Sequence, residues 1–340
     1  MSMVRRSLCA RSSGLGAGRG RIACLVVGLW LCLPVADILA AEPLRFTITA
    51  DNRGSRGFAT VLEQIAKAPG GAGAFMISVG DIDPAPVTRS QLDTAFGEAF
   101  PWYPVVGNHD ARVKAGKTTP NEMPYLRAYY EKNLKGKVNP GPEGTRETTY
   151  SFDAGDVHIA VINQYWNGKT QPDSDAAALA SLVRPLRRWL KADLQGSRKP
   201  WKLVVGHEPI FPQPDQDWES GRHGVGVLQI FSEAACKDFW SILQQEGVAA
   251  YICAHTHRYS RYQPEGSKVW QIDSAMARGG KDWKYDTFIV VTVDAKTLKF
   301  DTYRDLKERS KFEVTDSLSL KAETAAPPPP PSPPAKDPAG

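Results

Sequence analysis

The chain has little cysteine outside its first 41 residues. Cys9, Cys24 and Cys32 lie in that segment, and only Cys236 and Cys253 follow it. The remainder of the chain can therefore form at most one disulfide. Cys236 and Cys253 could pair in an oxidising compartment or remain two buried thiols, and their spacing favours neither outcome.

The chain also carries little net charge after residue 41. Of the formal net charge of +5, the first 41 residues supply +4, because they hold five arginines and one aspartate. The rest of the chain is close to neutral, so its charge does not indicate a nucleic-acid-binding surface. No nucleic-acid partner is expected.

The most apolar run, residues 22–33, is shorter than the roughly 20 residues that a membrane span needs. It follows an arginine-rich start and leads to the small residues Ala40 and Ala41, which is the pattern of an export signal. We expect residues 1–41 to be a signal peptide, and the mature protein to be periplasmic or secreted without a stable membrane span. Arg5 and Arg6 loosely match a twin-arginine signal, but paired arginines are common, so Sec export is favoured. An uncleaved N-terminal anchor is the alternative.

Between these ends, strands and helices alternate. The patterns predict strands at 45–50, 74–79, 102–106, 149–153, 157–163, 201–205, 249–254, 268–273 and 286–293, and helices at 57–67, 89–99, 124–134, 178–194 and 234–246. This alternation indicates an α/β domain with a mixed sheet or two stacked sheets. We place the domain at residues 42–310 and expect a disordered tail at 311–340, because proline dominates its second half.

Polar side chains follow five of these strands directly. The residues are Asp51, Asp81, the run Asn108-His109-Asp110, the pair His207-Glu208, and the pair His255 and His257. In α/β sheets the ligand site lies at the carboxyl ends of the strands, so these side chains should converge. Four of the six histidines in the chain belong to this set, and only His158 and His223 lie elsewhere.

The residue types in this set favour a metal site. Carboxylate, amide oxygen and imidazole without thiolate suit Zn, Mn, Fe, Co or Ni. A carboxylate can also bridge two ions, and a two-ion site is suited to displacement at a phosphate ester.

The motifs "GD", "GNHD", "GHEP" and "AHTH", in this order, resemble those of the calcineurin-like metallophosphoesterase superfamily, which includes the purple acid phosphatases. The resemblance covers about residues 45–305. It implies a four-layer αββα sandwich, in which two mixed β-sheets are flanked by helices. It also implies two divalent or trivalent metal ions, Fe, Mn or Zn, at one edge.

The resemblance implies a role for each motif residue. Asp81 would bridge the two ions, Asp51 and His257 would serve the first position, and Asn108, His207 and His255 the second. His109 would be the catalytic residue that protonates the leaving alkoxide, or an electrostatic partner of the phosphate. A metal-bridging hydroxide would attack phosphorus.

Two positions depart from the family pattern. Ala254 replaces the glycine before the last His-x-His, which requires the backbone to avoid a glycine-only conformation. Arg53 stands where the first motif usually has a metal-binding histidine, and a guanidinium cannot ligate. The tyrosine that fills this gap in purple acid phosphatases is missing too, since "GDIDPAP" offers only Asp83. We expect Arg53 to bind the substrate phosphate instead.

The remaining polar residues near the strand ends receive weaker assignments. His223, in a glycine-rich loop, is a candidate substrate-binding residue, and Asp110 and Glu208 are expected to cap turns or orient a histidine. Arg258 and Arg278 could bind an anion or solvate the rim. His158 is expected to be packed or solvated on its strand.

Together these features predict a metallophosphoesterase acting on a small phosphorylated substrate, either a phosphomonoester or a phosphodiester. One alternative is a degenerate, non-catalytic member of the same fold that binds a phosphorylated ligand or a partner. Another is a nuclease, which should show a basic cleft with stacking aromatics. The sequence leaves the oligomeric state, the metals and the substrate open.

Overall fold

The computed structural model describes residues 42–111, 122–168, 182–211, 233–279, 285–305 and 311–322. The chain divides into two units, Met1–Ala41 and Glu42–Gly340, and every described residue lies in the second. The signal peptide, the proline-rich segment after residue 322 and His223 lie outside the described residues, so the expectations for them stay predictions.

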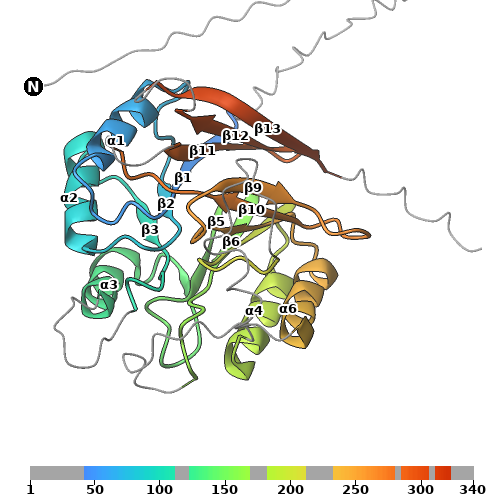
Figure 1. Cartoon of the computed structure of the whole chain (residues 1–340). Coiled ribbons are helices and arrows are strands. Elements are labelled where there is room, and N and C mark those ends of the chain that lie inside the picture. The colour runs from blue at the N-terminus through green and yellow to red at the C-terminus, as the bar shows by residue number, and fades with distance from the viewer. Residues whose placement is uncertain are drawn as a thin grey trace, which may run out of the picture. The chain divides into compact units, whose positions relative to one another are not determined.

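Two mixed β-sheets form the middle of the second unit (Figure 1). The first has the strand order β13-β12-β11-β1-β2-β3. Its strands are β1 (Leu44–Thr49), β2 (Met76–Ser78), β3 (Trp102–Pro104), β11 (Thr287–Val293), β12 (Thr297–Arg304) and β13 (Glu313–Lys321). β1, β2 and β3 run parallel, while β11 to β13 join them as an antiparallel extension.

The second sheet has the order β4-β5-β6-β7-β8-β10-β9. Its strands are β4 (Asn139–Pro140), β5 (Tyr150–Ala154), β6 (Val157–Val161), β7 (Trp201–Val205), β8 (Ala250–Cys253), β9 (Tyr259–Tyr262) and β10 (Trp270–Ser274). β6, β7, β8 and β10 are parallel, and antiparallel strands close both edges.

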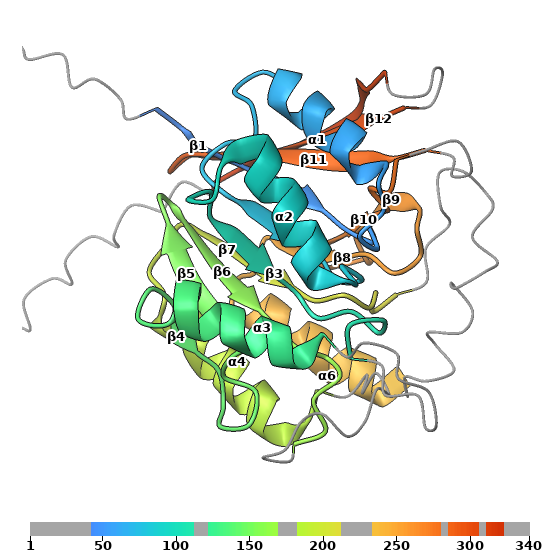
Figure 2. The same cartoon turned by 90° about the vertical axis from the view of Figure 1, so that its left-hand side faces the viewer.

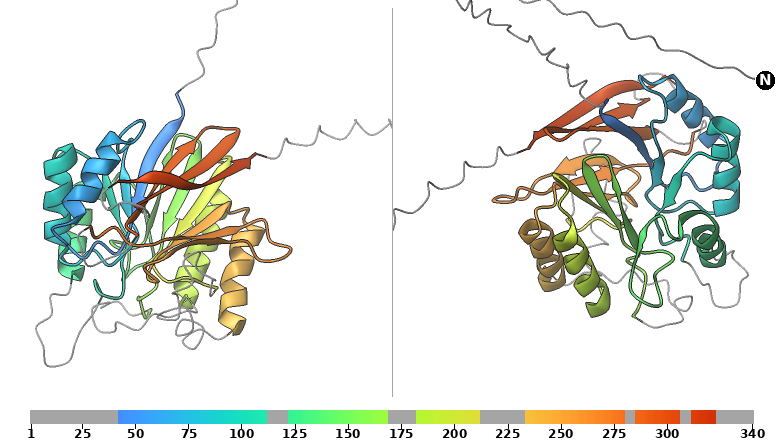
Figure 3. Two further views of the ribbon diagram at one scale, coloured as in Figure 1. Left: turned by 45° about the horizontal axis from the view of Figure 1, so that its top comes forward. Right: turned by 180° about the vertical axis from the view of Figure 1, so that it is seen from behind.

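Helices cover the sheets on their outer sides (Figures 2 and 3). The helices are α1 (Phe58–Lys67), α2 (Ala85–Phe96), α3 (Met123–Tyr129, continued by a π turn at Tyr130–Leu134), α4 (Arg184–Gly196) and α6 (Glu233–Gln245). α1 and α2 lie against the first sheet, and α4 and α6 against the second. The predicted four-layer αββα sandwich is confirmed.

Alternation along the strands of the second sheet distributes its side chains between two hydrophobic cores. Leu203 and Val205 of β7 belong to the large core shared with the first sheet, whereas Val204 packs with the leucines of α4 and with α6. Successive side chains of a strand point to opposite faces, so a continuous apolar run is what a sheet covered on both faces requires. Both faces of β7 are therefore buried against apolar side chains.

The predicted strands are all present, and the helix boundaries differ by a few residues. α2 begins at Ala85 instead of 89, because Pro86 occupies the first turn of a helix, where its missing N–H costs nothing. α4 begins at Arg184 instead of 178, with Pro185 at the same kind of position. Periodicity alone could not place these starts.

The sheet extends beyond the expected domain end at residue 310. β13 pairs with β12 from Thr297↔Lys321 to Arg304↔Glu313, so part of the segment 311–340 is ordered, and the boundary at 310 is wrong. β13 is an edge strand, and among its side chains only Leu318 is buried. Its hydrophobic signal is weak because neighbouring backbone, not side-chain burial, holds it.

Cys253 is a free, fully buried thiol at the end of β8. Cys253 therefore forms no disulfide in this structure. Among the described residues, no helix is long and apolar enough to cross a membrane.

His158 links the second sheet to α4. Its Nδ1 lies 2.8 Å from Asp153 Oδ1 on the paired strand β5, and its Nε2 lies 2.9 Å from Asp193 Oδ2 on α4. Burial by itself lowers the pKa of this imidazole, but the hydrogen bonds to Asp193 and Asp153 outweigh burial and raise it. The two aspartates thus favour the protonated form of this buried imidazole.

We expect His158→Gln to lower the free energy of unfolding by roughly 2 kcal/mol at acidic pH, because it removes a doubly bonded charge. A group whose pKa is raised on folding stabilises below its unfolded pKa, and the contribution disappears as pH rises through the folded pKa. Urea unfolding of wild-type and variant from pH 5.5 to 9.5 measures the difference. A gap that stays constant or widens with rising pH would contradict this role.

Candidate metal centre

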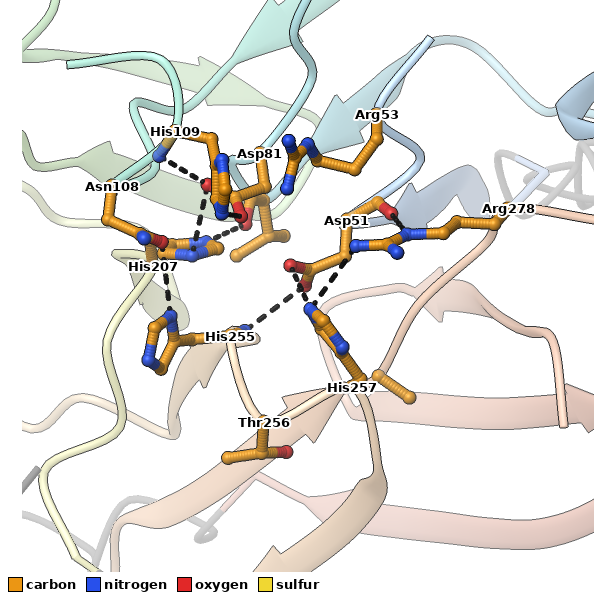
Figure 4. A network of polar contacts seen from close by, with 12 residues as sticks. Asp51, Arg53, Asp81, Asn108, His109, His207, His255, Thr256, His257 and Arg278 are labelled. Atoms are coloured by element: carbon orange, nitrogen blue, oxygen red, sulfur yellow. Dashed lines mark hydrogen bonds and ion pairs between the residues drawn. The ribbon is translucent and has the colours of Figure 1, made fainter. Parts of the chain in front are cut away.

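The five polar strand ends converge where the two sheets meet (Figure 4). Asp51 follows β1, Asp81 follows β2, and His207 follows β7. One ligand atom from each of these three buried side chains lies within 4.8 Å of the other two. Asn108 and His109, which follow β3, and His255 and His257, which follow β8, surround them.

The backbone turns sharply at these positions. Asp51, Arg53, Asp81, His255 and His257 all have φ between 50° and 70°, the left-handed region that L-residues avoid. These residues make up five of the seven described non-glycine residues with positive φ. Such strain concentrates at functional sites, where the surrounding fold holds it in place. Ala254 is not among the seven, as its substitution for glycine requires.

Hydrogen bonds orient the two carboxylates. Asp51 Oδ2 accepts the backbone N–H of His255 at 3.1 Å, while Oδ1 lies 3.3 Å from His257 Nε2. Asp81 Oδ1 accepts the backbone N–H of His109 at 2.8 Å and lies 3.5 Å from His207 Nε2. Each carboxylate thus ties its own strand to a strand end from another motif.

His207 presents one nitrogen to the cluster. Its Nδ1 donates to the Val79 carbonyl oxygen at 2.7 Å, which leaves Nε2 facing the carboxylates. His207 Nε2 and Asp51 Oδ1 are both buried and have no hydrogen-bond partner. A buried polar atom without a partner is costly, and a metal ion would satisfy both atoms at once. The residues present therefore fit a metal.

The other predicted ligands lie beside this group. His255 Nδ1 is 3.2 Å from Asn108 Oδ1, and its Nε2 is 3.5 Å from Glu208 Oε2. Glu208 Oε1 in turn accepts a hydrogen bond from the Tyr165 hydroxyl at 2.5 Å. Asp110 accepts the backbone N–H groups of Gly107 and Ile82 at 2.8 and 3.0 Å. Both carboxylates hold the motif loops, which is the kind of role expected for them.

Burial and neighbouring charges shift the pKa values of Asp51, Asp81 and His207 in different directions. Burial by itself would raise the pKa of Asp51, but His257, His207 and His255 hold it well below its usual range. Burial, together with the Asp51 carboxylate, raises the pKa of Asp81 to about 6. Burial lowers the pKa of His207, but Asp81, Asp51 and Glu208 raise it to about 9. The carboxylates that favour a proton on His207 equally favour a metal cation in its place.

Two arginines complete the surroundings. Arg53 forms an ion pair with Asp83 through its Nε. Arg278, for which the sequence left anion binding or a solvated rim open, is buried and donates from Nε to the Asp51 carbonyl oxygen at 2.8 Å. No sequence pattern pointed to this contact, because the two residues lie 227 positions apart.

Two mixed sheets between helices, with carboxylates and imidazoles gathered at the strand ends, define a metallophosphoesterase-type sandwich. The pattern of the calcineurin-like phosphoesterase family (Metallophos) matches residues 44–259, and the chain belongs to this family.

Relatives of known name agree with this assignment. Tartrate-resistant acid phosphatase type 5 from Oryctolagus cuniculus is 25% identical over 280 residues, covering 74% of this chain and 78% of that protein. Purple acid phosphatase 17 from Arabidopsis thaliana is 25% identical over 240 residues, covering 66% and 64%. Among solved structures, PhoD is similar at a TM-score of 0.58 and 10% identity, covering 83% of this chain and 70% of PhoD. GAP50, the anchor in the inner membrane complex of Plasmodium, reaches 0.53 at 15% identity, covering 83% and 90%.

Proposed function

We propose that this protein is a metal-dependent phosphoesterase that hydrolyses a small phosphomonoester or phosphodiester. The observation that carries the proposal is the group of three buried ligand side chains, Asp51, Asp81 and His207, in which Asp51 Oδ1 and His207 Nε2 make no hydrogen bond. One cation placed among these ligand atoms would contact groups from three different strand ends.

In this proposal the centre has two positions for divalent or trivalent ions, with Fe, Mn and Zn as candidates. Asp51 and His257 would hold the first ion, Asn108, His207 and His255 would hold the second, and Asp81 would serve both. Bound ions would supply Lewis acidity toward the phosphate oxygens and would activate water for attack. The bond from phosphorus to the leaving oxygen then breaks as the bond from water forms.

His109 is suited to protonate the leaving oxygen. Its backbone N–H is fixed on Asp81 Oδ1, and its Nε2 lies 3.7 Å from Asp81 Oδ2. The side chain is 24% exposed, so it borders both the cluster and solvent. Such a position allows proton transfer to a departing alkoxide and reprotonation from bulk water.

The direct test combines metal analysis of the purified protein with hydrolysis of p-nitrophenyl phosphate and of bis(p-nitrophenyl) phosphate. We expect bound metal and turnover of at least one ester when Mn, Zn or Fe is supplied. Metal-free protein that turns over neither ester under all three conditions would overturn the proposal.

His109→Ala should lower kcat by about 10²- to 10⁴-fold, the usual contribution of a general acid, while the metal content stays unchanged. The loss should be smaller for esters with good leaving groups, which need less protonation, than for alkyl phosphates. His158→Ala provides a matched control, because that histidine bonds two aspartates outside the cluster. An equal loss for both leaving groups would argue against the acid role.

A non-catalytic member of the same fold is the second candidate, and Arg53 is the observation that favours it. It stands at a ligand position and is paired with Asp83. GAP50 of Plasmodium, with a similar fold, is described as an anchor. A protein that binds metal and a phosphorylated ligand but shows no turnover would support this candidate.

A further inference from the structure

The two positions of the centre have different electrostatic surroundings. Around the second position lie further carboxylates, with Glu208 Oε2 3.5 Å from His255 Nε2 and Asp110 bound to the Gly107 backbone. Beside the first position, formed by Asp51 and His257, lies the guanidinium group of Arg278, while the Arg53 side chain lies next to Asp81 (Figure 4).

Arg278 reaches the atom of His257 that faces the cluster. Its Nη2 lies 3.4 Å from His257 Nε2, the same nitrogen that lies 3.3 Å from Asp51 Oδ1. Its Nε is held on the Asp51 carbonyl oxygen at 2.8 Å. A permanent positive charge therefore stands beside the ligand nitrogen of the first position.

The fold holds Arg278 in this place. Asp286 Oδ1 accepts the backbone N–H groups of both Arg278 and Gly279, at 2.7 and 2.8 Å. Gly279 also packs directly on Gly57, such that a Cβ on Gly279 would lie 1.9 Å from the Gly57 carbonyl oxygen. The Asp51 loop and the Arg278 segment are thus locked together, and the guanidinium is a built component of the centre.

Arg53 adds to the asymmetry because it occupies a position where a metal ligand is expected. At its position the resemblance expected a ligand for the first ion, but the Arg53 guanidinium forms an ion pair with Asp83 instead. The side chain extends from the Asp51 loop toward Asp81 in Figure 4. The first position therefore lacks the ligand that the resemblance expected, and the Arg278 guanidinium lies beside it.

We propose that the centre is asymmetric: it retains one ion at the second position, and Arg278 supplies fixed positive charge at the first, which binds its ion weakly and exchangeably. A neighbouring charge changes the affinity of a site for a proton by roughly 10- to 1,000-fold, and a metal cation is subject to the same repulsion. The inference rests on the metal-binding part of the proposed function and is independent of turnover.

The test is a Zn²⁺ titration of metal-stripped, tag-free protein by calorimetry, together with metal analysis after gel filtration. We expect one Zn²⁺ per chain to survive gel filtration. A second should bind only at free concentrations roughly 100-fold higher. Two ions with affinities within tenfold of each other would overturn the proposal.

Arg278→Gln removes the charge and keeps a hydrogen-bond donor, so the second Zn²⁺ should bind at least about tenfold more tightly than in wild-type protein. Arg278→Lys keeps the charge and should leave that ion weakly bound. Arg187→Gln is the matched control, because this arginine pairs with Asp238 of α6 and should leave both affinities unchanged. A folded Arg278→Gln protein with unchanged Zn²⁺ affinities would contradict the role of Arg278, and if it does not fold, the wild-type titration decides.

The outcome also separates this inference from the proposed function. Absence of any bound Zn²⁺ would overturn both the metal centre and its asymmetry. One tightly bound Zn²⁺ without hydrolysis of either ester would support the asymmetry and contradict the enzyme.

Discussion

Asp81→Asn is expected to lower kcat/KM for a phosphate ester on the order of 10³-fold, which corresponds to about 4 kcal/mol of transition-state stabilisation. Asp81 is the carboxylate assigned to both metal positions, and the amide keeps its shape while losing its charge. The retained metal should fall with activity, as measured by metal analysis and initial rates.

The same substitution should leave the metal-free fold at least as stable as wild-type. Burial raises the pKa of Asp81 to about 6, so the ionised carboxylate costs stability at neutral pH, and the neutral amide avoids that cost. The amide oxygen can still accept the His109 N–H. Asp238→Asn, on the exposed side of α6, is the control and should change neither activity nor metal content. Full activity of Asp81→Asn would refute the assigned role.

Gly279→Ala is expected to destabilise the protein by about 3 kcal/mol or more. A Cβ at this position would lie 1.9 Å from Gly57 O, and the residue has φ of +65°. Backbone atoms cannot yield as a flexible side chain can, so the two loops must separate. A destabilisation of this size lowers the Tm by roughly 2–4 °C for each kcal/mol, which calorimetry resolves.

Gly196→Ala provides the comparison for this prediction. Gly196 ends α4, and an added Cβ there would meet no atom within 4 Å. Alanine in a helix is favoured over glycine, so this variant should be as stable as wild-type protein or slightly more so. If Gly279→Ala unfolds at the same temperature as Gly196→Ala, the close packing of Gly57 and Gly279 is not required.

Much of the site could be predicted from local sequence, because each motif lies at the end of one apolar strand. Asp51, Asp81 and His207 each follow such a strand, and parallel strands place their carboxyl ends at one edge. The ion pair between Asp83 and Arg53 could not be predicted in this way, because it joins two separate loops. For Arg278 the sequence left anion binding and a solvated rim open, because nothing in its own segment reveals what its long side chain reaches.

The sequence by itself determined the alternation of strands and helices, the order of the motifs and the chemical types gathered at the strand ends. These features depend on burial along single elements, which periodic patterns record. Only the tertiary structure decided that β13 extends the sheet, that Cys253 stays unpaired and that Arg278 stands beside His257. Those outcomes depend on how two sheets pack and on how far side chains reach across them, and contacts between residues 227 positions apart leave no periodic trace in the sequence.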